Sequence, residues 1–313
     1  MRIIHLTDTH IRERKPTCRT DDSYLDTQLG KLRFALDHLD NDYTICLHSG
    51  DLGDSNPMSE FVKWNLIDTL GDCEFDDDDF YVVAGQHDLE NHSLNSINRT
   101  SLGLLTADHT LRLLNKEVIV IKRPNEQVVI RIYPCSYGEE IPKPKTYEDN
   151  PGYKVYNILL MHRMMIDTPL FPGQRATNAE FFFNRHTEFD LILTGDNHQR
   201  IIYKDDGRMF INGGSMMRAK SNQVDYKPAF SIIDITNEGM AEETIHWPID
   251  DSLVSTEHRD TATVRDELQE FIQSMGEGLD DISFKANLQS YFARERTLKP
   301  DRNRILNLLN ERS

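Results

Sequence analysis

The feature that most restricts the fold of this chain is a series of five short polar blocks, each of which follows an apolar, β-rich run. The first block follows Ile3 to Leu6, and the other four follow later runs in the same way. The blocks are Asp8-Thr9-His10, Gly50-Asp51-Leu52-Gly53-Asp54, Gly85-Gln86-His87-Asp88, His162 and Gly195-Asp196-Asn197-His198. Because ligands bind beyond the carboxyl ends of strands in α/β sheets, we expect the five blocks to converge on one site.

The hydrophobic pattern around these blocks predicts alternating strands and helices, followed by a group of strands. Strands are expected at residues 3–6, 43–47, 80–84, 118–121, 128–133, 156–161 and 190–194, and helices at 24–40, 57–70 and 178–186. The helix at 57–70 has an apolar face of Phe61, Trp64, Ile67 and Leu70. Runs at 200–203, 208–212, 229–235 and 243–247 are spaced like consecutive antiparallel strands. The pattern favours two sheets packed face to face, with helices outside.

The chain changes character near residue 250, so we divide it into a catalytic domain, 1–250, and a helical segment, 251–313. Residues 259–313 contain three short amphipathic helical patterns, and from Lys285 onward there are seven Lys or Arg against three Asp or Glu. Helices this short are unstable alone in water. Their apolar faces therefore need a surface, on this chain or on a partner.

Charge and composition exclude several classes of protein. The 313 residues include 52 Asp or Glu and 35 Lys or Arg, a net charge of −17, which excludes a uniformly basic nucleic-acid coat. No run approaches the roughly 20 apolar residues of a membrane span, and Asp8 arrives before a signal-peptide core can form. The four cysteines show no CxxC spacing. We therefore expect a cytoplasmic protein with no membrane contact and no disulfide or zinc-ribbon framework.

The side chains of the polar blocks suit a two-metal site. Two divalent ions about 3.5–4 Å apart can hold the attacking and the leaving oxygen of a phosphoryl transfer. Carboxylates and imidazoles suit Mn²⁺, Fe²⁺ or Zn²⁺, and the blocks contain no cysteine thiolate. Asp51 directly follows Gly50, which allows close backbone approach, so we expect it to bridge the two ions. A histidine that is not a ligand can then donate a proton.

The order of the blocks resembles that of the calcineurin-like metallophosphoesterases. Within them, the opening residues 1–10 and the segment Ile211-Asn212-Gly213-Gly214-Ser215-Met216-Met217-Arg218 are similar to the SbcD-type nucleases of DNA double-strand-break repair, including bacteriophage recombination endonuclease subunits. The resemblance covers about residues 1–235. It implies a four-layer α/β/β/α sandwich of two mixed sheets with a small C-terminal helical appendage. It also implies DNA as substrate, a homodimer, and an SMC-like ABC ATPase subunit onto which residues 259–313 dock.

The resemblance also assigns roles to individual residues. It implies that the first metal is held by Asp8, His10, Asp51 and His198. It implies that the second is held by Asp51, Gln86, His162 and Asp196. His87 takes the position of the family's catalytic histidine. The expected ions are Mn²⁺, with Mg²⁺ as the alternative, and the expected location is the host cytoplasm if the protein is phage-encoded.

Three positions depart from the family pattern. Gln86 replaces an asparagine and keeps an amide oxygen with one more methylene. Asp196 replaces a histidine, and an anionic oxygen should shift the site toward Mn²⁺ or Mg²⁺. Asp54 replaces a substrate-contacting histidine, so it is the candidate substrate contact at that position. Arg218 is interpreted either as a second, phosphate-binding contact or as part of a structural ion pair, and Asp88 as a residue that orients His87 or its loop.

The leading hypothesis is therefore a metal-dependent DNA nuclease. Two alternatives remain open. One is another enzyme of the same fold, acting on small nucleotides or on phosphoproteins. The other is a non-catalytic scaffold that holds the ATPase, which the departures Gln86 and Asp196 keep open.

Overall fold

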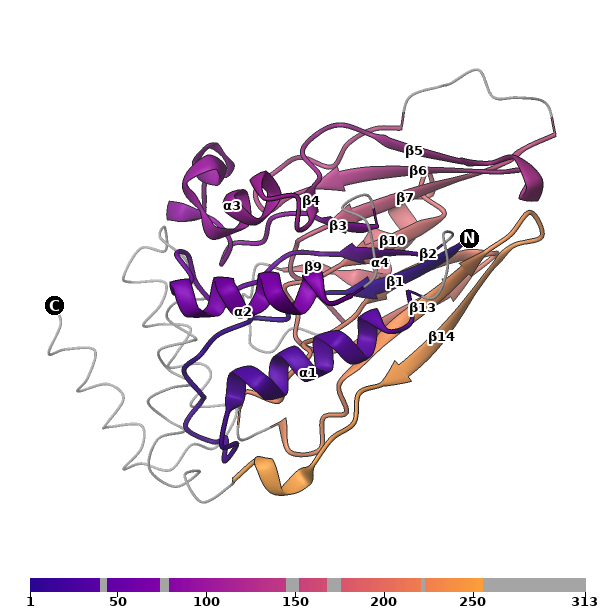
Figure 1. Cartoon of the computed structure of the whole chain (residues 1–313). Helices are drawn as coiled ribbons and strands as arrows, with labels where there is room; N and C mark the ends of the chain where they lie inside the picture. Colours follow the sequence, from indigo (N-terminus) through magenta and orange to yellow (C-terminus); the bar gives the residue numbers. More distant parts are fainter. Residues whose placement is uncertain (40–43, 74–78, 145–151, 168–175, 221–222, 256–313) are drawn as a thin grey trace, which may run out of the picture. The chain divides into compact units, whose positions relative to one another are not determined.

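The structure is a computed structural model that describes residues 1–39, 44–73, 79–144, 152–167, 176–220 and 223–255 (Figure 1). The chain divides into two units, residues 1–167 with 177–258 and residues 168–176 with 259–313. The helices and strands that the structure describes belong to the first unit. The amphipathic patterns expected in residues 259–313 lie outside the described residues.

Two six-stranded mixed sheets form the framework, as the sequence predicted. The first sheet has the order β14 (Met240–His246), β13 (Ala229–Ile235), β1 (Arg2–Leu6), β2 (Thr44–His48), β3 (Phe80–Val82) and β4 (Arg112–Leu113). The second has the order β11 (Ile201–Asp205), β12 (Arg208–Asn212), β10 (Leu191–Thr194), β7 (Lys154–Met161), β6 (Val128–Cys135) and β5 (Ile119–Arg123). Strands β1 to β4 are parallel, as are β12, β10, β7 and β6. Two short strands, β8 (Met165–Ile166) and β9 (Thr177–Asn178), pair separately.

Among the described residues, four α-helices accompany the sheets: α1 (Tyr24–Leu36), α2 (Glu60–Gly71), α3 (Ser101–Ala107) and α4 (Ala179–Arg185). Each begins after a side chain that accepts a backbone N–H of the first turn; these N-caps are Ser23, Ser59, Thr100 and Asn178. Short 3₁₀-helices lie at Glu90–His92, Leu94–Arg99, Pro124–Glu126 and Asp251–Leu253. Within the described ranges, no helix is long and apolar enough to cross a membrane.

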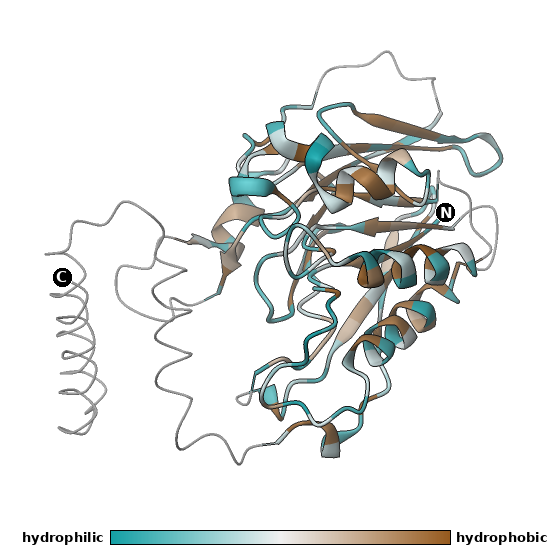
Figure 2. Ribbon diagram, turned by 60° about the vertical axis from the view of Figure 1, so that its left-hand side comes forward, coloured by the Kyte–Doolittle hydropathy of each residue, from teal (hydrophilic) through white to brown (hydrophobic). Residues whose placement is uncertain are grey.

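Three apolar clusters show that these elements form four layers. One cluster joins α1, α2 and α3 to the first sheet, through residues such as Leu32 and Ile4. The second fills the space between the sheets, where Ile3 of β1 and Leu193 of β10 are buried. The third joins the second sheet to Phe182 and Phe183 of α4. Figure 1 shows α1 and α2 side by side along the first sheet, and in Figure 2 the helices carry both hydrophobic and hydrophilic segments. The α/β/β/α order is thus the observed one.

The expected apolar face of the second helix is wrong in part. Helix α2 begins at Glu60, and its buried side is the row Val62, Leu66 and Leu70, spaced four residues apart. Phe61 and Trp64 lie outside this row and are 56% and 63% exposed. The spacing of Phe61 and Trp64 is helical, but the side of the helix that meets the sheet is set by the neighbouring row.

The expectation of one antiparallel group between residues 200 and 247 is also wrong. β11 and β12 form a hairpin at one edge of the second sheet, and β12 runs parallel to β10. β13 and β14 belong to the first sheet, where β13 lies antiparallel to β1. The chain therefore crosses between sheets after β12. This crossing brings Ser215 and Met216 to hydrogen bonds with the carbonyls of His198 and Asp8.

Candidate metal centre

All five polar blocks follow a strand of the parallel part of a sheet, namely β1, β2, β3, β7 and β10. The structure brings every proposed cation ligand and the proposed catalytic histidine into one connected group: Asp8, His10, Asp51, Gln86, His87, His162, Asp196 and His198. The connecting loops are tied to one another, since the N–H of Asp8 donates to the carbonyl of Gly50 over 3.1 Å and the N–H of His10 donates to that of Asp51. The convergence expected at the strand ends is observed.

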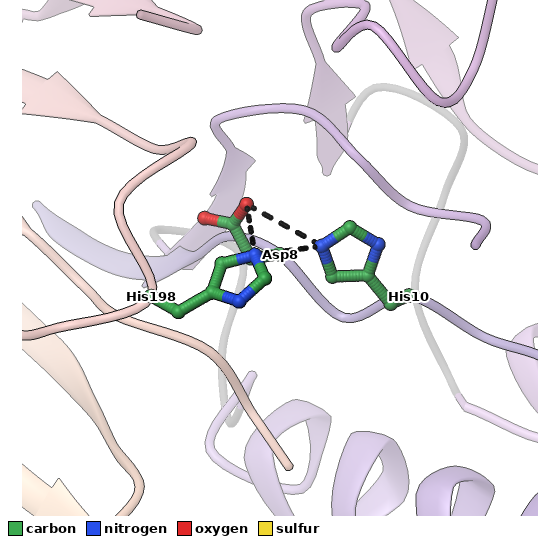
Figure 3. A group of neighbouring side chains, drawn as sticks. All are labelled: Asp8, His10 and His198. Carbon is green, nitrogen blue, oxygen red and sulfur yellow. Dashed lines mark hydrogen bonds and ion pairs between the residues drawn. The ribbon is translucent and has the colours of Figure 1, made fainter. Parts of the chain in front are cut away.

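The first half of the group contains Asp8, His10 and His198 (Figure 3). The Nε2 atoms of His10 and His198 are 3.0 Å apart, and an oxygen of Asp8 lies 3.7 Å from each. Three potential ligand atoms thus face one point from two different sheets. This is a donor set of two imidazoles and one carboxylate, which suits a divalent transition metal.

The second half contains Asp51, His162, Gln86 and Asp196. Nε2 of His162 lies 3.4 Å from Asp51 Oδ2 and 2.8 Å from the amide oxygen of Gln86. The Gln86 amide nitrogen donates to Asp196 over 2.9 Å, so this amide joins His162 to Asp196. Nδ1 of His162 donates to the carbonyl of Ser49 over 2.6 Å, which directs Nε2 toward the centre.

Asp51 lies between the two halves. Its Oδ2 atom is buried and has no hydrogen-bond partner among the described residues. Three histidine nitrogens surround it, since Nε2 of His162, His10 and His87 lie at 3.4, 3.9 and 4.0 Å. A buried, unpaired carboxylate oxygen is unfavourable, and divalent cations shared through this atom would satisfy it. The donor set therefore fits two cations with Asp51 between them.

The pKa values of the group reflect the competition between burial and charge. Burial opposes ionisation of Asp8 and Asp51, but the histidines that face them, His10 and His198 beside Asp8 and His162 beside Asp51, hold the pKa of both carboxyls below their usual values. Burial lowers the pKa of His198 to about 4. Burial also opposes protonation of His162, but the charge of Asp51 holds its pKa well above the usual value. The carboxylates are thus ionised at neutral pH and available to cations.

The loops that carry the ligands adopt an unusual backbone. Asp8, His10, Asp51 and Asp196 have φ angles of 48°, 44°, 55° and 74°, in the left-handed region that non-glycine residues rarely adopt. Such strain is concentrated at functional sites, where the surrounding structure enforces it. Gly50 has φ of 94°, and a Cβ there would lie 2.6 Å from Nδ1 of His162. Glycine is therefore required at this position by both conformation and space.

Asp88 holds the loop that carries Asp51. Its buried carboxylate accepts the backbone N–H groups of Asp51 at 2.8 Å, Gly85 at 2.9 Å, Gly53 at 3.2 Å and Leu52 at 3.4 Å. Burial, followed by the charge of Asp51, raises the pKa of Asp88 to about 6. The geometry agrees with a residue that orients the loop.

His87 is exposed and has a defined orientation. Its Nδ1 donates to the carbonyl of Asp54 over 2.7 Å, which leaves Nε2 toward Asp51 Oδ2. His92, five residues further along the chain, is also exposed, and its ring centroid lies 6.0 Å from that of Tyr137. Nε2 of His87 is thus the imidazole nitrogen free to meet a substrate.

The two expected substrate contacts have different environments. Arg218 is 2% exposed, pairs with Asp251 at 2.7 Å and donates to the carbonyls of Val224 and Asp250. Of the two interpretations of Arg218, these contacts support the structural ion pair, because the guanidinium is bound by groups of the protein itself. Asp54 is 30% exposed, and both of its oxygens lie 2.9 Å from Nη1 of Arg12.

Sequence reasoning did not identify Arg12, Ser49 or Tyr137. Ser49 acts through its carbonyl, which any residue supplies, so no side-chain signal exists. Tyr137 follows β6, and its ring centroid lies 6.4 Å from that of His162, a proximity created by the pairing of β6 with β7. Arg12 stands two residues after His10, and this closeness was the available signal.

The comparison with protein-family models agrees with the fold. Residues 1–200 match the family model described as calcineurin-like phosphoesterase. The chain is similar to a candidate 5'-nucleotidase from Staphylococcus aureus, with 13% identity, a TM-score of 0.49, and coverage of 86% of this chain but 58% of that one. It is also similar to the calcineurin-like phosphoesterase YfkN from Bacillus subtilis (14% identity, TM-score 0.45, 87% and 98% covered). A third similar structure is a novel archaeal phosphodiesterase (14% identity, TM-score 0.37, 78% and 100% covered).

Comparison with curated proteins gives no match. The family match, however, spans more than half of the chain, and its residues 1–200 include every proposed cation ligand from Asp8 to His198. The chain therefore belongs to the calcineurin-like phosphoesterase family.

Proposed function

We propose that this phosphoesterase is a metal-dependent DNA nuclease that hydrolyses phosphodiester bonds. The observation that carries a two-cation site is Asp51 Oδ2, buried without a hydrogen-bond partner among the described residues and surrounded by three histidine nitrogens. The choice of DNA rests on the sequence resemblance of residues 1–10 and 211–218 to the SbcD-type nucleases.

The residues present divide the work as follows. Asp8, His10, Asp51 and His198 would hold one cation; Asp51, Gln86, His162 and Asp196 would hold the other. When bound, the cations neutralise charge on the phosphate and lower the pKa of water. In its imidazolium form, His87 would donate the proton of Nε2 to the leaving oxygen, because its Nδ1–H is already donated to the carbonyl of Asp54.

A Mn²⁺-dependent assay on linear duplex DNA tests this function. Wild-type protein should cleave DNA when Mn²⁺ is present, and Asp51→Asn should abolish cleavage because it removes the charge shared by both cations. The matched control is Asp26→Asn, an exposed carboxylate on α1, which should retain wild-type activity. Hydrolysis of cyclic nucleotides or phosphopeptides without hydrolysis of DNA would instead identify another enzyme of this fold. Failure to bind Mn²⁺ would favour a scaffold.

We also propose that the protein acts as a homodimer with an SMC-like ABC ATPase. For the dimer, the exposed side chains Phe61 and Trp64 lie three positions apart on α2 and give one helix an apolar outer surface. A second copy of the chain is the occupant that we assign to this surface. Trp64→Ser should then lower the molar mass measured by light scattering from that of a dimer to that of a monomer; an unchanged mass would reject this surface as the interface.

A further inference from the structure

Asp54 joins an arginine to one of the proposed metal ligands. Both carboxylate oxygens of Asp54 lie 2.9 Å from Nη1 of Arg12, so the arginine holds the carboxylate from one side. On the other side, Oδ1 of Asp54 lies 3.8 Å from Nδ1 of His10. The backbone carbonyl of Asp54 separately accepts Nδ1 of His87. The side chain and the main chain of Asp54 therefore face different histidines.

The two nitrogens of His10 have contrasting surroundings. Nε2 faces the centre, at 3.0 Å from Nε2 of His198 and 3.7 Å from Asp8. Nδ1 is buried and has no hydrogen-bond partner in the part of the chain that the structure describes. A histidine that binds a metal through Nε2 carries its proton on Nδ1, and this N–H is normally directed to a carboxylate, a carbonyl or water. The carboxylate placed to accept it is Asp54.

We propose that Asp54 is a positioning residue for the first cation: its carboxylate accepts the Nδ1–H of His10, and Arg12 fixes that carboxylate. The inference rests on the metal centre of the proposed function. The present separation of 3.8 Å is about 1 Å longer than a hydrogen bond. The Asp54 carboxylate and the Arg12 guanidinium that holds it are 30% and 28% exposed, so a small joint movement of the pair can close this distance. Asp54 thus acts on His10. The sequence resemblance had instead suggested that Asp54 contacts the substrate.

The role predicts a specific effect on metal affinity. Loss of such an outer carboxylate usually weakens metal binding by about 10–100-fold. In calorimetric titrations of the whole protein with Mn²⁺, Asp54→Ala should weaken one of two sites by this factor and leave the other unchanged. Asp54→Asn should weaken the same site less, because it keeps an acceptor oxygen. Arg12→Gln should also weaken that site, since the carboxylate is no longer fixed.

A matched control distinguishes the loss of the carboxylate that orients His10 from the loss of any nearby negative charge. Glu13 is an exposed carboxylate in the loop that carries His10 and Arg12. The change Glu13→Gln therefore removes one nearby negative charge without altering His10. Its Mn²⁺ affinities should equal those of the wild type. If Glu13→Gln and Asp54→Ala weaken both sites alike, long-range charge explains the effect and the inference is wrong.

Kinetics on DNA give the second readout. Wild-type Mn²⁺ affinities in Asp54→Ala together with a raised KM would make Asp54 a substrate contact and overturn the inference, while the nuclease function would stand. If the wild type binds no Mn²⁺, both the metal centre and this inference fail. Should Asp54→Ala not fold, Arg12→Gln decides, and unchanged affinity in that variant would count against the role.

Discussion

Replacement of Gly85 by alanine tests how closely the two loops pack around Asp51. A Cβ at Gly85 would lie 2.7 Å from Cγ of Asp51 and would also collide with its carboxylate oxygen and its backbone nitrogen. Because the backbone of Asp51 is involved, a side-chain rotation cannot relieve the collision. The loop that carries Asp51 must therefore move away from Gly85.

The size of the effect follows from this displacement. Ordinary contacts of a Cβ begin near 3.4 Å, so Asp51 must move by about 1 Å, and a misplacement of this size can cost about 100-fold in rate. Overpacking of this kind usually destabilises a protein by about 1–3 kcal/mol. At about 2–4 °C per kcal/mol, the melting temperature of Gly85→Ala should fall by a few degrees or more.

Gly30 provides the matched control. It lies inside α1, is exposed and has no atom within 4 Å of a Cβ placed there. Gly30→Ala should therefore stabilise the protein by about 0.4–1 kcal/mol and leave activity unchanged. The assay is cleavage of bis(p-nitrophenyl) phosphate at saturating Mn²⁺, with melting followed by scanning fluorimetry. If Gly85→Ala keeps activity within twofold of the wild type and melts at the same temperature, the packing argument is refuted.

Four further predictions concern the centre and the C-terminal segment. His87→Ala should keep its bound Mn²⁺ but lose about 10²–10⁴ in rate, the usual range for a general acid or base; loss of metal would make His87 a ligand instead. Asp196→His should retain activity with a preference shifted away from Mg²⁺, and Asp196 oxygens more than about 3 Å from both ions in a Mn²⁺ complex would refute its role as ligand. The raised pKa of His162 means that its protonated form stabilises the metal-free protein below about pH 6.5 and that this contribution is lost as pH rises through the folded-state pKa. Mn²⁺ affinity should therefore increase with pH with release of protons, measured by calorimetry in buffers of different ionisation enthalpy, and a pH-independent affinity would contradict this. Deletion of residues 259–313 should leave Mn²⁺-dependent cleavage of short DNA nearly intact but abolish co-purification with the ATPase; unchanged binding of the ATPase would reject the docking role.

The site could be predicted because its residues are local in sequence and follow strands. Asp8 and Asp51 each come a few residues after a buried strand, and β1 and β2 pair in parallel, so their ends coincide. The same logic places His162 after β7 and His198 after β10. Because these strands pair in parallel, polar blocks that are far apart in the sequence lie close together at the ends of the strands.

The remaining features depend on contacts between distant segments. The burial of Arg218 arises because it pairs with Asp251, and the spacing of these residues carries no signal for that contact. The side of α2 that is buried depends on the sheet beneath it, which is why Phe61 and Trp64 were misplaced. The left-handed backbone of Asp196 was not predicted either, because aspartate adopts this region more often than most residues but its presence alone does not require it.

Anomalous diffraction at the manganese edge, from crystals grown with Mn²⁺, tests the two-cation centre most directly. We expect two anomalous peaks per chain, one beside His10 and His198 and the other beside His162, with the Asp51 carboxylate within bonding distance of both. A single peak, or two peaks of which one lies more than about 3 Å from every oxygen of Asp51, would contradict it.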